Sequence, residues 1–295
     1  MKLLACTLIS SLLAVDAGGQ GHAAHTAASG SASTGELLAF VSAARAGAER
    51  YGNRNDAIAA GFRPLGRDFP SMGEHWVNPG KVIAGRFDLA DPAMLIYATI
   101  DGKPVLLGVV FAIPLEAGQP LPPLPGGLQA WHEHNGTVDE ESFLPEHGGG
   151  HSPTRLAGTR LAILHVWTLL PNPAGYLAAE NWSLPFARLH LAAPATIPEP
   201  AARALSLVSG SGDFYANLFE TEFSSVAGDE WHQALAAAID GARAIVSARD
   251  AKDALSGAEI SALGELWTRF TASISVRSPA LAQRLRGEKR DGEAP

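Results

Sequence analysis

Two apolar runs joined by a tight-turn dipeptide constrain the fold of this chain most. Residues 93–100 and 105–113 are rich in aliphatic side chains, and Asp101-Gly102 lies between them. This dipeptide suits the positive φ angles of a two-residue hairpin turn. The two runs are therefore predicted to pair as antiparallel strands.

Further short runs extend the predicted sheet region on both sides of this hairpin. A sequence pattern typical of short strands and turns covers residues 62–190, and residues 159–170 and 187–192 are further candidate strands. Residues 114–127 are rich in Pro and have no periodicity, which predicts an exposed loop.

Helical patterns precede and follow this region. A capping-box pair, Ser33 and Glu36, predicts a helix that ends near Gly61. Toward the C-terminus, a second pair at Ser256 and Glu259 precedes apolar residues at helical spacing. The predicted class is α+β, with an N-terminal helix, a central antiparallel β-sheet region and a C-terminal helical region.

The first 33 residues are predicted to lie outside the fold. Residues 1–17 combine a basic start, a short apolar run and small residues, which is typical of a signal peptide, and residues 18–33 are predicted to be a disordered leader. No run is long enough for a transmembrane helix, so the mature chain is predicted to be periplasmic or secreted without a transmembrane segment. The rest divides into residues 34–196, a helix plus a β-rich, His-containing domain, and residues 197–295, a helical extension.

Charge and cysteine content exclude several classes of function. Lys and Arg number 22 against 30 Asp and Glu, and a net charge of −8 disfavours nucleic acid as a partner. The single cysteine, Cys6, excludes an internal disulfide framework and a metal site built from several cysteines.

The histidines suggest a site in the sheet region. Seven of the ten lie between residues 75 and 190, and two of them form the pattern His132-Glu133-His134. On a strand, residues i and i+2 point to the same face about 7 Å apart, so both imidazoles can reach one cation. The alternative is that one ring is exposed and the other satisfies a backbone group.

Two more histidines are candidate ligands. His165 lies within an apolar strand, where a buried imidazole is either a hydrogen-bonded core residue or a third ligand. His75, followed by Trp76, is predicted to lie in a turn-rich loop that enters the sheet, and the aromatic ring would shield it from water.

Two resemblances bear on these residues. One segment resembles the first metal motif of cupins, and it contains Gly126, His132, His134 and then Asp139 or Glu140. The resemblance implies that two histidines and an acid bind one metal. The residues before His165 lack the second cupin motif.

Six segments within residues 40–182 resemble a group of exported bacterial proteins without a settled activity. They are residues 44–51, 61–64 (GFRP), 72–79 (MGEHWVNP), 107–110 (LGVV), 164–167 (LHVW) and 172–175 (NPAG). The resemblance implies that His75 and His165 belong to one recurring frame, and it supplies no catalytic residues.

These patterns predict an exported metalloprotein with a mononuclear site built from histidines. The expected ligands are His75, His132, His134 and His165, and imidazole ligation suits Zn or Cu, with Fe or Mn if a carboxylate joins. An open position would allow catalysis on a small-molecule substrate, with a glutamate at position 74 or 140 (Glu74, Glu140) as general base. The alternatives are a metal-binding or sequestration protein without turnover, and an interaction module whose histidines are structural.

Overall fold

The computed structural model describes residues 34–116, 118–134, 160–210, 230–249 and 253–276, together with residues 278, 279, 282 and 285. Residues 1–33, the location of the predicted signal peptide and leader, lie outside this description, as does Ser33 of the first predicted capping box. The elements are α1 (Thr34–Glu49), α2 (Arg54–Ala59), β1 (Arg63–Phe69), β2 (Gly73–Val77), α3 (Pro79–Ala84), β3 (Met94–Ile100), β4 (Lys103–Leu115), η1 (Pro125–Gly127), β5 (His132–His134), β6 (Arg160–Trp167), α5 (Leu184–Arg188), α6 (Glu199–Ser206), α8 (Glu230–Ser247) and α9 (Gly257–Ser275).

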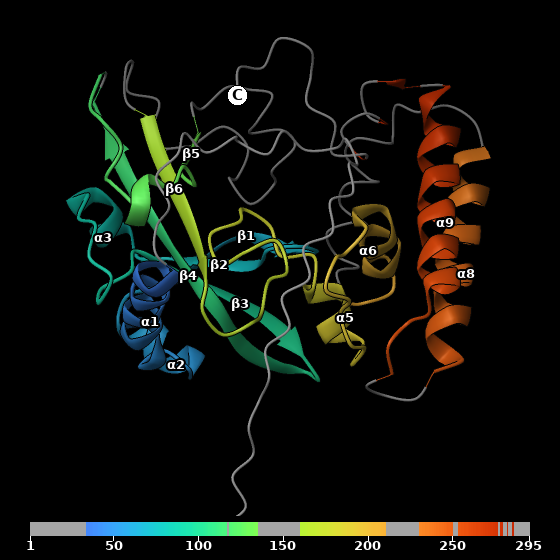
Figure 1. Ribbon diagram of the computed structural model, residues 1–295, viewed down its shortest axis with the longest axis horizontal. Coiled ribbons are helices and arrows are strands. Elements are labelled where there is room, and N and C mark those ends of the chain that lie inside the picture. Colours follow the sequence, from blue (N-terminus) through green and yellow to red (C-terminus); the bar gives the residue numbers. More distant parts are fainter. Residues whose placement is uncertain are drawn as a thin grey trace, which may run out of the picture.

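Among the described residues, six strands form one sheet at the centre of the fold (Figure 1). The strand order is β1-β2-β3-β4-β6-β5, and each neighbouring pair is antiparallel. The predicted hairpin is confirmed, because β3 pairs with β4 and the turn residues Asp101 and Gly102 have φ angles of 53° and 70°. The predicted α+β class is also confirmed, since helices precede and follow the sheet.

The two faces of the sheet pack against different helices. Side chains alternate along a strand, so Val109 and Val110 of β4 point to opposite faces. Val109 belongs to a buried cluster with Phe40 of α1, and Val110 belongs to a second cluster with Leu184 at the start of α5. We call these the α1 face and the α5 face, and Figure 1 shows the two helices on different sides of the strands.

The C-terminal helices pack in a further buried cluster, which also includes Phe69 of β1 and Phe186 of α5. Trp267 and Phe270 of α9 are fully buried in it, together with Leu205 of α6. The predicted capping box is confirmed: the Ser256 side chain accepts from the Glu259 amide, and the Glu259 side chain accepts from the Ser256 amide. Within the described part of the chain, no helix is both long and apolar enough to cross a bilayer.

Two predicted elements are wrong. The N-terminal helix does not continue to residue 61, because it breaks at residues 50–53, where the Asn53 side chain accepts from the Asn55 amide and starts α2. Residues 187–192 are not a strand: the segment begins inside α5, and Ala192 makes an isolated bridge beyond it.

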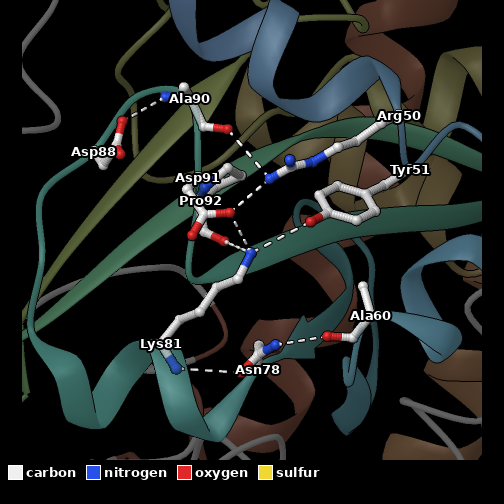
Figure 2. Close-up of polar contacts among 9 residues, drawn as sticks. All are labelled: Arg50, Tyr51, Ala60, Asn78, Lys81, Asp88, Ala90, Asp91 and Pro92. Carbon is white, nitrogen blue, oxygen red and sulfur yellow. Dashed lines mark hydrogen bonds and ion pairs between the residues drawn. The ribbon is translucent and has the colours of Figure 1, made fainter.

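A charged cluster connects the turn after α1 and helix α3 to the loop before β3 (Figure 2). Lys81 Nζ lies 2.7 Å from Asp91 Oδ1 and 3.3 Å from the Tyr51 hydroxyl, and Arg50 lies 2.5 Å from the same Asp91 oxygen. The hydrogen bond from Lys81 is the main reason that the pKa of Asp91 is lowered. These contacts hold the turn after α1, helix α3 and the loop before β3 together.

Candidate metal centre

Two buried histidines meet on the α5 face of the sheet. His75 lies on β2 and His165 on β6, and they are 6% and 4% exposed. Their Nε2 atoms are 3.1 Å apart, and their ring planes are inclined by 73°. The prediction of a buried strand around His165 is confirmed, whereas the loop predicted at His75 is wrong because that residue lies in a strand between β1 and β3.

The register of the sheet explains why these two residues share a face. His75 pairs with Ile96 on β3, and Ile96 pairs with Gly108 on β4. Val110, two residues beyond Gly108, pairs with His165. Paired residues point to the same face, and so do residues i and i+2 of one strand. Both imidazoles therefore stand on the α5 face, although they are 90 positions apart in the sequence.

A third histidine lies beside this pair. His132 of β5 pairs with Ile163, which is two residues from His165 and therefore on the same face. The rings of His132 and His165 are parallel within 6°, with centroids 5.2 Å apart. His132 is partly exposed, so this end of the cluster is the part that solvent reaches.

Two predicted site residues are not brought to the cluster by the described structure. The backbone of His134 pairs with Leu161 in β5 and β6, and its side chain lies outside the described residues. Glu140 lies wholly outside them. Both assignments stay predictions.

Glu74, the other predicted general base, is not part of the cluster. It precedes His75 on β2 and pairs with Tyr97, which places it on the α1 face. Its Oε2 lies 3.1 Å from Arg54 Nη2 and accepts a hydrogen bond of 3.2 Å from Trp76 Nε1. The carboxylate is therefore engaged with a cation on the far side of the sheet from the imidazoles.

A second ion pair connects β1 to α5. Arg188 Nη2 lies 2.5 Å from Asp68 Oδ1, and the Arg188 side chain is 2% exposed. Burial raises the pKa of Asp68 more than the positive charge of Arg188 lowers it. This pair fixes the position of α5 over the face that carries the histidines.

Trp167 is a residue of the site region that the sequence motifs did not single out for a role. It lies two residues after His165, with ring planes inclined by 11° and centroids 6.3 Å apart. Its indole Nε1 donates to the Ala178 carbonyl over 2.7 Å. Trp167 is 1% exposed and belongs to the α5-face cluster, so the imidazoles stand in apolar surroundings.

The spacing of the two Nε2 atoms fits ligation of one ion. Two imidazole nitrogens bound at about 2.0–2.1 Å to a tetrahedral ion lie about 3.3 Å apart, and the observed separation is 3.1 Å. The same separation also fits a hydrogen bond between two neutral rings, one nitrogen donating to the other. No group of three or more His, Cys, Asp or Glu side chains among the described residues has the geometry to hold an ion, so the described centre is a pair with a neighbour.

Fold and site together define an α+β protein with a buried histidine pair on one face of an antiparallel sheet. Comparisons of the chain with models of protein families, with curated proteins and with solved structures found no match.

Proposed function

We propose that the protein is an exported metal-binding protein in which His75 and His165 hold one Zn or Cu ion. The observation that carries this proposal is the 3.1 Å separation of two buried Nε2 atoms that come from strands far apart in the sequence. Neutral imidazoles without thiolates suit these two metals. His132, whose ring centroid is 5.2 Å from that of His165, is the nearest candidate for a further ligand after a change of ring orientation.

Binding without turnover is the form of this function that the geometry favours. A catalytic site needs an acid or base within hydrogen-bond reach of the reacting group. Glu74 is held by Arg54 on the opposite face. We therefore propose uptake or sequestration of the ion as the main role, and catalysis with Glu140 as base is the extension that would require a carboxylate beside the pair.

A structural role of the pair is the second candidate. Both rings are almost completely buried, and a buried imidazole needs a hydrogen-bond partner. A neutral His75–His165 hydrogen bond would meet this need without a metal. The chain would then be an interaction module whose helical extension binds a partner.

Metal analysis of the purified mature protein tests the proposal. After incubation with Zn or Cu and removal of free ions, we expect one bound ion per chain, and we expect its loss in His75→Ala and His165→Ala. His232→Ala is the matched control, because His232 is exposed on α8 and away from the sheet. His132→Ala should weaken retention without abolishing it.

The opposite results are equally definite. Absence of bound metal in the unsubstituted chain, or retention of a full ion in both His75→Ala and His165→Ala, would overturn metal binding at this pair. Thermal stability that is identical with and without a chelator would then support the structural role.

A further inference from the structure

His75 and His165 meet although three strand steps separate them. These steps run from β2 to β3, from β3 to β4 and from β4 to β6. Neighbouring strands lie about 4.8 Å apart, so in a flat sheet the two backbones would be about 14 Å apart with parallel side chains. The Nε2 atoms are nevertheless 3.1 Å apart. The sheet must therefore curl toward its α5 face between β2 and β6.

An irregularity in the register lies at the right place to produce this curl. Ile96 of β3 pairs with Gly108, but the next residue, Tyr97, pairs with Leu106, so Leu107 is an extra residue on β4. A bulge of this kind bends its strand and increases the local twist. It lies in the same row as His75, which pairs with Ile96.

Gly108 allows β4 and β6 to approach closely beside the bulge. A Cβ atom built on Gly108 would lie 2.5 Å from the Val166 carbonyl oxygen and 3.3 Å from the Trp167 Cα. The 2.5 Å contact is too short for any side chain and the 3.3 Å contact is tight, and both neighbours are backbone atoms that a rotamer change cannot move. Leu107, the extra residue, accepts hydrogen bonds at its carbonyl from the Leu169 and Leu170 amides, so the bulge also holds the segment that follows β6.

We propose that Gly108, together with the bulge at Leu107, is the positioning residue of the histidine pair. In this role it acts through the backbone, and no contact with the imidazoles is required. It sets the curvature that brings β2 and β6 around until the rings meet. The inference concerns the site of the proposed function, but the proximity of the rings can be measured without any ion.

The test compares two glycine substitutions with similar steric consequences. Gly108→Ala should force β4 away from β6 and separate the rings. Gly47→Ala is the matched control, because a Cβ at Gly47 of α1 would overlap the Leu89 carbonyl oxygen, another backbone atom, and Leu89 packs with α1 on the face opposite the pair. Both variants are expected to lose stability, and separation of the two rings is expected in Gly108→Ala alone.

The primary readout is nuclear magnetic resonance of the full chain with isotope-labelled histidine. Protons on the carbons that flank the two Nε2 atoms should give a nuclear Overhauser effect between His75 and His165 in the unsubstituted protein and in Gly47→Ala. We expect this signal to disappear in Gly108→Ala. If Gly108→Ala does not fold, Leu107→Ala, which removes the buried side chain of the bulge, should weaken the same signal.

Zinc affinity gives the second readout, at a temperature at which circular dichroism shows each variant folded. Displacing residues that orient ligands lowers metal affinity by about 10–100-fold, which is the expected rise in Kd for Gly108→Ala relative to Gly47→Ala. An Overhauser effect that persists in Gly108→Ala, or that vanishes equally in both variants, would overturn the inference. If the unsubstituted chain binds no zinc while the Overhauser effect disappears only in Gly108→Ala, the metal proposal is refuted and the positioning role is supported.

Discussion

A double-mutant cycle on His75 and His165 separates a metal centre from a structural hydrogen bond. The cycle compares the free energies of unfolding of the unsubstituted chain, His75→Ala, His165→Ala and the double variant. The coupling energy does not include the destabilisation caused by the two cavities, because each cavity destabilises one single variant and the double variant equally and so cancels in the cycle. Coupling is measured once in a chelator and once at a buffered zinc concentration about one hundred times the Kd.

The two conditions are expected to give different couplings. In the chelator, the expected interaction between the two neutral rings is one buried hydrogen bond, which corresponds to a coupling energy of about 1–2 kcal/mol. Zinc at one hundred times its Kd stabilises the unsubstituted fold by a further amount of about 2.7 kcal/mol through linkage. Each single variant and the double variant lose this same amount, so the coupling in zinc should exceed that in chelator by about 2.7 kcal/mol.

Urea unfolding followed by circular dichroism supplies the four free energies in each condition. A parallel cycle that combines His75→Ala with His232→Ala should give a coupling near zero in both, because His232 lies on α8. Equal coupling of His75 with His165 in chelator and in zinc would refute the reasoning, since the ion would then not depend on the pair.

Three ionisable residues give further expectations. Burial raises the pKa of Tyr97 to about 12. The stability linked to the protonated hydroxyl is complete below pH 10, and about 2–3 kcal/mol of it is lost as the pH rises to 12. Urea titrations of Tyr97→Phe should lack this alkaline loss. Arg188→Met should cost about 3–5 kcal/mol because it leaves Asp68 buried without its cation, and the added substitution Asp68→Asn should recover part of this in the same titrations. The hydrogen bond from Arg249 is the main reason that the pKa of Glu259 is lowered from 4.5 to about 2. The stability that the ionised Glu259 carboxylate gives to the fold is present above pH 4.5 and is lost as the pH falls to 2. In Glu259→Gln, the melting temperature should therefore decline less steeply with acid.

The sequence predicted the elements whose signals are local. The β3–β4 hairpin follows from a turn dipeptide between two apolar runs, and the start of α9 follows from a capping pair three residues apart. Strand β2 has no such signal, because its five residues, Gly73–Val77, lie between turn-forming residues. Its partner on one side, β1, is joined to it by a short turn, but its partner on the other side, β3, begins only at Met94. Tertiary pairing therefore made a strand where local propensity indicated a loop.

The candidate site shows the same division between local and distant information. Strand alternation predicts that His132 and His134 share a face, and this stays a prediction because the His134 side chain lies outside the described residues. Adjacent positions on β2 explain why Glu74 and His75 face opposite sides. The sequence motifs predicted His75 and His165 at one site, but local patterns could not predict how the two rings meet, because this depends on strand order and on the curl of the sheet.

The curl of the sheet makes the distance between the ring nitrogens sensitive to small changes in the backbone. In a flat sheet, substitutions on β4 would reach a ligand on β2 only through an intervening strand, and packing at one position would have little effect on that distance. Here the nitrogens are 3.1 Å apart across three strand steps, so a small change in the angle between β4 and its neighbours is multiplied across the sheet into a larger change at the rings. If His75 and His165 bind an ion as proposed, its affinity should therefore depend more strongly on the backbone around Gly108 than on most side chains that lie nearer to the two rings.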